Sequence, residues 1–232
     1  QIRDHFLWSF LMTLFSVCLA YLISIPLGLL AAARRNRFFD RASGFGVLAL
    51  DSLPSFLVAT LLMVVAVPLF YAKHPPLGPI DNSRPKILSF ILKNPERLVL
   101  PLIAYTYGAL AFLSRTMRSS LLEILQQDYI RTARAKGLPE WRVLTRHALK
   151  NALLPIITLF GTVFPALISG SVILESIFAI PGMGRATLDA MQDKDMPMIV
   201  AVFTLTGVLT ILGYLIADLL YSLIDPRIRH DR

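Results

Sequence analysis

The chain has 232 residues, of which 55% are hydrophobic and only 16% are charged. A soluble domain usually carries about 25% charged residues, so the composition argues against a soluble globular protein. The net charge of +8 would suggest nucleic acid in a soluble protein. In a membrane protein it is explained by basic loops on one side of the bilayer, and we expect no nucleic-acid partner.

Long apolar runs predict an all-α membrane protein with five transmembrane helices in one domain covering residues 1–232. About 20 apolar residues cross the bilayer core as a helix. The third run is shorter, but it can extend past Arg115 because long basic side chains reach toward the headgroups. The approximate spans are residues 8–33, 44–71, 98–125, 151–175 and 197–223.

The first span contains the only cysteine, Cys18. A single cysteine cannot form an intrachain disulfide, and free cysteine behaves as a small hydrophobe, so we expect Cys18 to pack rather than to react. The basic turn Arg34–Arg41 follows. It predicts an anchor near anionic headgroups, which makes membrane lipid an expected partner.

Asp51 lies in the first half of the second predicted span. An acidic side chain inside a membrane is a candidate functional site by default. The alternative is that Asp51 lies near the cytoplasmic headgroups and pairs with Arg41 or another loop base. We favour the ion pair, because Asp51 follows Arg41 by only ten residues.

Two segments are expected on the outer side of the membrane. Lys73–Arg97 connects the second and third spans, and Lys86–Leu92 within it favours a short helix. Glu175–Arg185 follows the fourth span, where a Pro-Gly pair and a further glycine favour a turn.

The longest polar segment, Gln126–Lys150, predicts two short helices with a break between them. Tyr129, Ile130 and Ala133 form one apolar face of the first helix. Gly137 is expected to end this helix, as glycine does at the C′ position. In the second helix we expect Trp141, Leu144 and Ala148 to share an apolar face, and Pro139 suits its first turn.

Basic residues predict the topology. Arg34–Arg41, the segment Arg115–Lys150 and the C-terminal tail together hold 15 Lys and Arg residues, and the segments on the other side hold 8. Cytoplasmic loops carry the excess of Lys and Arg. We therefore place Arg34–Arg41, Gln126–Lys150 and the tail in the cytoplasm.

The sequence contains no G-x-x-x-x-G-K-[ST] motif, so we do not expect the chain to bind ATP through a P-loop. The four histidines are dispersed and give no metal-ligand spacing. We expect no enzyme activity, no metal and no cofactor. An ion-coupled carrier or an intramembrane enzyme is the alternative from another class, but it would favour polar groups deep in the spans.

Several segments resemble one family closely. Asp128–Gly137 (DYIRTARAKG) and His147–Pro155 (HALKNALLP) are similar to the cytoplasmic EAA loop of ABC importer permeases, in the branch that imports peptides. Ser52–Phe56, Glu175–Arg185 and Leu223–Arg227 also resemble that branch. Arg131 and Thr132 depart from the wider EAA pattern, which has Glu and Ala there, and Leu149-Lys150 replaces its usual Leu-Pro.

The resemblance implies an ABC importer permease core of the MetI-like type in the bacterial inner membrane. Its partners would be a second permease subunit, ABC ATPase subunits and an extracytoplasmic solute-binding protein. The cargo would be a dipeptide or oligopeptide, with nickel or glycosides as alternatives. We also expect an N-terminal helix of the full-length protein to be missing, because the chain begins with Gln1 rather than Met.

By resemblance, the first helix of the loop Gln126–Lys150 is the coupling helix that receives force from the ATPase. We expect Gly137 to adopt a left-handed conformation and Ala133 to lie where the ATPase wall approaches closely. Gly137→Asp or Ala133→Glu should then leave the subunit inserted and abolish transport. Of the two outer segments Lys73–Arg97 and Ser176–Asp195, we expect one to contact the solute-binding protein. The expected coupling residues are Arg131, Ala133, Arg134, Lys136 and Gly137.

Overall fold

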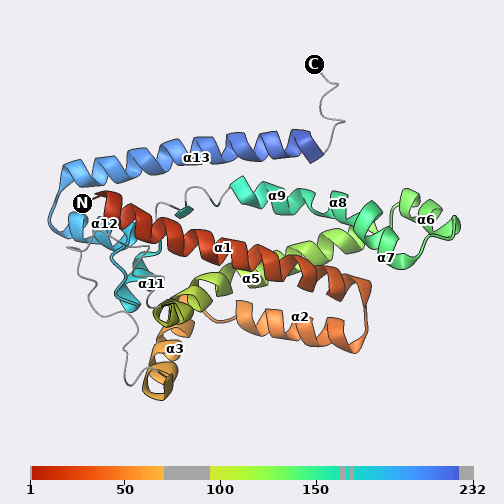
Figure 1. The fold of residues 1–232 in the computed structure, drawn as a ribbon, viewed down its shortest axis with the longest axis horizontal. Helices are drawn as coiled ribbons and strands as arrows, with labels where there is room; N and C mark the ends of the chain where they lie inside the picture. Colours follow the sequence, from red (N-terminus) through yellow and green to blue (C-terminus); the bar gives the residue numbers. More distant parts are fainter. Residues whose placement is uncertain (1, 71–94, 162, 164–165, 168–169, 225–232) are drawn as a thin grey trace. The chain divides into compact units, whose positions relative to one another are not determined.

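A computed structural model describes residues 2–70, 95–161, 163, 166–167 and 170–224. All the regular elements in this part of the chain are helices (Figure 1). The elements are α1 (Ile2–Ala33), α2 (Phe38–Asp51), α3 (Ser55–Phe70), α5 (Glu96–Ile124), α6 (Asp128–Ala135), α7 (Glu140–Arg142), the π-helix η1 (Val143–Ala148), α8 (Leu149–Ala152), α9 (Leu154–Gly161), α11 (Val172–Ile177), α12 (Met183–Gln192) and α13 (Met196–Ile224).

The chain divides into two compact units, and the three longest helices, α1, α5 and α13, contribute residues to both. Unit 1 contains Gln1–Leu19, Leu53–Gly108 and Val163–Ile211, and unit 2 contains Ala20–Ser52, Ala109–Thr162 and Leu212–Arg232.

Three of the described helices are long and apolar enough to cross a membrane: α1, α5 and α13. They correspond to the first, third and fifth predicted spans, residues 8–33, 98–125 and 197–223. The pair α2 and α3 adds a fourth span if the two helices count as one. The predicted all-helical membrane class is therefore confirmed, whereas the number of five spans stays a prediction.

The predicted span 44–71 is not one helix. Helix α2 begins at Phe38, before the predicted start, and ends at Asp51, and α3 begins at Ser55. Pro54 lies in the break. Proline has no N–H to donate and disfavours helical geometry at the residue before it, which accounts for the interruption.

The predicted span 151–175 is also divided, into α8, α9 and α11. Pro155 lies in the first turn of α9, where its missing N–H is tolerated. Gly170 has a φ of +58°, a left-handed conformation that cannot continue a right-handed helix. Ser171 then caps α11, because its hydroxyl accepts a hydrogen bond from the N–H of Leu174 at 3.3 Å.

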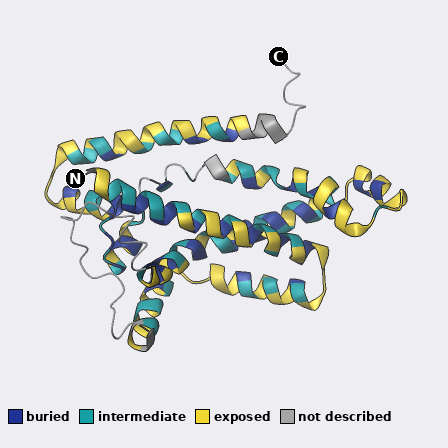
Figure 2. Cartoon of the chain, viewed as in Figure 1, coloured by how far each residue is buried: buried dark blue, intermediate teal, exposed yellow. Residues whose placement is uncertain are grey.

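Each unit has its own apolar core. Trp8, Met12 and Phe178 are buried together in unit 1, and Met117 and Ile130 are buried in unit 2. Many apolar side chains of α13 are exposed instead (Figure 2). An exposed apolar helix face of this kind suits lipid or a partner helix better than water.

Cys18 is exposed on α1, so the expected packing within the chain is not seen. Most of the predicted outer loop Lys73–Arg97, with its expected short helix at Lys86–Leu92, lies outside the described residues. The same holds for most of the motif Leu223–Arg227.

Candidate functional site

Helix α6 of unit 2 is held by two side chains on its inner face. Ile130 is fully buried and Ala133 is 6% exposed. They belong to the same apolar cluster as Val143, Leu144 and Ala148 of the π-helix η1. The predicted apolar face is confirmed for these two residues, and it seats α6 on the element that follows it in sequence.

Tyr129, the third residue predicted for that face, is 41% exposed. Its hydroxyl accepts a hydrogen bond from the side-chain amide of Asn151 at 2.8 Å. The phenol therefore links α6 to α8. The contact is polar, which is why an apolar periodicity alone misplaces this residue.

Gly137 ends α6 as predicted. It has a φ of +76° and follows the C-cap residue Lys136. The N–H of Gly137 donates to the carbonyl of Arg134 at 2.9 Å, and the N–H of Leu138 donates to the carbonyl of Ala133 at 3.4 Å. These two bonds form a Schellman motif, which satisfies carbonyls that the last helical turn leaves open.

A two-bond ion pair joins α6 to α7 across this turn. The Arg134 guanidinium donates through Nε to Glu140 Oε2 at 3.1 Å and through Nη2 to Glu140 Oε1 at 2.6 Å. These hydrogen bonds raise the pKa of Arg134 above its ordinary value. Both side chains are about half exposed, so the pair contributes little stability, but it fixes the direction of the turn.

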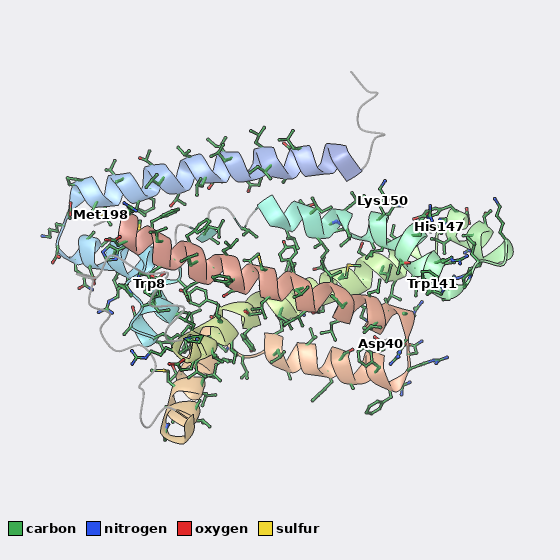
Figure 3. All side chains as sticks on the ribbon, in the orientation of Figure 1. Trp8, Asp40, Trp141, His147, Lys150 and Met198 are labelled. Carbon is green, nitrogen blue, oxygen red and sulfur yellow. The ribbon has the colours of Figure 1, made fainter. Side chains whose placement is uncertain are left out.

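The second helix of the loop departs from the predicted periodicity. Leu144 and Ala148 are buried as expected, but Trp141 is 62% exposed. The reason is the π-helix Val143–Ala148, whose i→i+5 bonds widen the turn and shift its register. Trp141 lies instead at the surface of α7 (Figure 3), with the Arg142 guanidinium 5.3 Å from its ring centroid.

The predicted coupling residues divide into two groups. Arg131, Arg134, Lys136 and Gly137 are exposed on one short segment. Ala133 is buried within the chain's own core, and its expected approach to a partner wall stays a prediction. Its small side chain permits the close seating of α6.

Two aspartates of α2 pair with arginines of α5 in unit 2. Arg115 contacts Asp51 at 2.7 Å, so Asp51 is paired as favoured, although with a base of α5 rather than with Arg41. Asp40, which sequence reasoning did not single out, has a side chain only 4% exposed. It accepts two hydrogen bonds from Arg118, at 2.6 and 2.8 Å.

Comparison with known proteins gives one consistent result. The family described as "Binding-protein-dependent transport system inner membrane component" matches residues 24–230. The oligopeptide transport system permease protein AppB of Bacillus subtilis is 40% identical over 223 residues, which cover 96% of this chain and 69% of AppB. The dipeptide transport system permease protein DppB of the same organism is 38% identical, over 95% of this chain and 67% of DppB. DppB of Escherichia coli K12 is 36% identical, over 90% of this chain and 67% of DppB.

Proposed function

This chain belongs to the family of inner membrane components of binding-protein-dependent transport systems, and on that basis we propose that it is a permease subunit of a peptide importer. It would form half of a translocation path and would not itself hydrolyse ATP. The proposal also includes a peptide cargo, the partner subunits, five membrane spans and a location in the bacterial cytoplasmic membrane.

Support for peptide cargo comes from the relatives, whose names assign them to oligopeptide and dipeptide transport. They match at least nine tenths of this chain. Nickel or a glycoside remains the alternative cargo for the same architecture. The proposed partners are a second permease subunit, ATPase subunits and an extracytoplasmic binding protein.

The observation that carries the proposal is the construction of the loop Gln126–Lys150. A short helix, α6, is seated on η1 by Ile130 and Ala133, closed by a Schellman motif at Gly137 and clamped to α7 by Arg134. A short helix that is packed along one face and closed at its C-terminal end moves as a body when pushed. This rigidity is what a helix must have to pass force from an ATPase to the membrane spans.

The exposed side of this segment is basic and aromatic. Arg131 and Lys136 are exposed, and Trp141 with its stacked Arg142 adds a large apolar surface beside them. Trp and Arg are enriched among the residues that dominate protein interfaces. We propose that these groups meet an apolar pocket with an acidic rim on the ATPase, and that Ala133 contributes by seating α6.

The deciding experiment is ATP hydrolysis by the assembled complex in lipid vesicles. We expect a loaded binding protein to stimulate hydrolysis when it carries a dipeptide or an oligopeptide. Parallel measurements with nickel and a glycoside test the alternative cargoes. Copurification of the chain without any ATPase subunit, under conditions where transport persists, would contradict the proposal.

A further inference from the structure

The segment α11–α12 of unit 1 is built around one buried carboxylate. Glu175 of α11 is fully buried. Its Oε1 accepts a hydrogen bond from the Ser9 hydroxyl at 2.7 Å, and its Oε2 accepts one from the backbone N–H of Arg185 at 2.8 Å. The Ser9 oxygen also accepts a hydrogen bond from the N–H of Met183 at 2.7 Å. Helices α1, α11 and α12 therefore meet at this carboxylate.

The donors explain why the carboxylate is there. Helix α12 begins at Met183, and the first N–H groups of a helix have no partner inside it. Its N-cap, Gly182, has no side chain to supply one. Ser9 and Glu175 supply these acceptors from elsewhere in the chain, and a negative charge at this end also suits the helix dipole.

Two glycines make room for this arrangement. A Cβ atom on Gly182 or on Gly170 would overlap the Glu175 carboxylate, and on Gly170 it would also come within 2.7 Å of the Ser9 oxygen. A further link holds the same loop to α1, because His5 Nδ1 lies 2.9 Å from the carbonyl oxygen of Pro181. Gly182 and Glu175 of the motif Glu175–Arg185 thus serve one structure together with Gly170.

Both oxygens of the Glu175 carboxyl group act as hydrogen-bond acceptors. The groups that contact its two oxygens are a hydroxyl donor and backbone N–H donors. A glutamine in the same place would turn its amide NH₂ toward one of these donors. Because a buried group without a matching partner is unfavourable, even this isosteric change should loosen the contact.

We propose that Glu175 is a positioning residue that, together with Ser9, latches the start of α12 onto α1. The latch holds two walls of an open pocket of about 690 Å³, which is lined by residues of both helices, including Arg3, His5 and Asp189. The pocket wall on α12 belongs to Ser176–Asp195, one of the two segments of which we expect one to contact the binding protein. The role in docking rests on the proposed function, whereas the latch itself does not.

The latch is tested by cysteine labelling in the assembled complex, in a Cys18→Ser background. Ala190 is a buried residue of α12, 6% exposed, and Ala190→Cys reports release of that helix. We expect Glu175→Gln and Ser9→Ala to raise the rate at which a maleimide labels this cysteine several-fold. Glu175→Asp should be labelled more slowly than Glu175→Gln.

Ser16→Ala is the matched control. Ser16 is a buried serine of α1 in the same unit, but its hydroxyl donates to the Met12 carbonyl of its own helix at 2.7 Å. This variant should leave the labelling rate unchanged. If Glu175→Gln fails to accumulate, Ser9→Ala decides the question, because it keeps the carboxylate. If Ser9→Ala is labelled at the same rate as the control Ser16→Ala, the latch is overturned.

The docking role is tested by titrating the complex with its binding protein loaded with a dipeptide. The half-saturating concentration should rise roughly tenfold in Glu175→Gln, as the loss of one hydrogen bond predicts, with the maximal rate of ATP hydrolysis unchanged. Faster labelling without this shift would refute the docking role and leave the proposed function intact. Failure of the unsubstituted complex to respond to any binding protein would refute the proposed function instead.

Discussion

Gly137 has open space where a Cβ atom would lie, so its backbone conformation, and not crowding, restricts this position. We expect Gly137→Val to strain the end of α6 by roughly 1–2 kcal/mol and to reduce transport while membrane abundance stays near normal. Gly137→Asn is the matched variant, because asparagine tolerates positive φ. It should keep most of the activity.

Transport and abundance measured in the same cells decide this prediction. Gly137→Asp differs from Gly137→Asn only in charge, so a loss confined to the aspartate variant identifies an acidic partner surface near the turn. Full transport by both Gly137→Asp and Gly137→Val, with the ATPase still bound, would remove the coupling role assigned to this turn.

Asp40 and Asp51 form a natural comparison, since both pair with arginines of α5. The Asp40 side chain is 4% exposed and the Asp51 side chain is 36% exposed. Removing one partner of a buried pair leaves an uncompensated charge. We expect Asp40→Asn to lower the free energy of unfolding by roughly 2 kcal/mol, and Asp51→Asn by about 0–1 kcal/mol.

Thermal unfolding of the purified chain in detergent measures both effects under one condition. A midpoint for Asp40→Asn at or above that of Asp51→Asn would contradict the assignment of Asp40 as the stronger contact between α2 and α5.

At the scale of elements, α6 depends on its seat against η1. Ala133→Glu would place a carboxylate in an apolar cluster, and a buried unpaired charge is strongly destabilising. We therefore expect this variant to lose folded abundance together with transport, in contrast to the expectation from sequence. Ala135→Glu is the matched control, because Ala135 is exposed on the same helix and should tolerate the change.

Protease digestion of inverted membrane vesicles provides the readout. Cleavage within Gln126–Lys150 should become faster in Ala133→Glu and should stay unchanged in Ala135→Glu. Equal protection in both variants would mean that Ala133 is not held inside the loop.

Local signals predicted most of this loop. The end of α6 was predicted from the glycine at position 137, and the burial of Ile130 and Ala133 from the helical spacing of apolar residues. Both signals lie within a few residues of the feature that they predict. The π-helix had no such signal, because its wider turn responds to packing, and so Trp141 was placed on the wrong face. Asp40 was missed because its partner lies far along the chain, on α5.

At the scale of the whole molecule, the charge distribution predicts the orientation in the membrane. In a Cys18-free background, we expect Lys136→Cys to resist an impermeant maleimide added to intact cells and to react in inverted vesicles. The physical reason is the excess of basic residues in the loops that share its side. Labelling of position 136 from outside intact cells would reverse the orientation.

Composition and apolar length predicted the membrane class and the helices α1, α5 and α13. They could not predict where a span is interrupted. Pro54 and Pro155 lie within apolar runs that look continuous by hydropathy, and hydropathy does not register a missing N–H. The Glu175 contact with Ser9 was equally invisible, because it joins residues that are 166 positions apart.

The two ion pairs between α2 and α5 have a mechanical consequence. Asp40 and Asp51 are eleven residues apart, about 16 Å along a helix, whereas Arg115 and Arg118 are separated by about 4.5 Å. The two arginine side chains must therefore reach in opposite directions along α2. Sliding α2 along its axis in either direction stretches one of the two pairs, so the pairs together favour a single axial position of α2 against this part of α5.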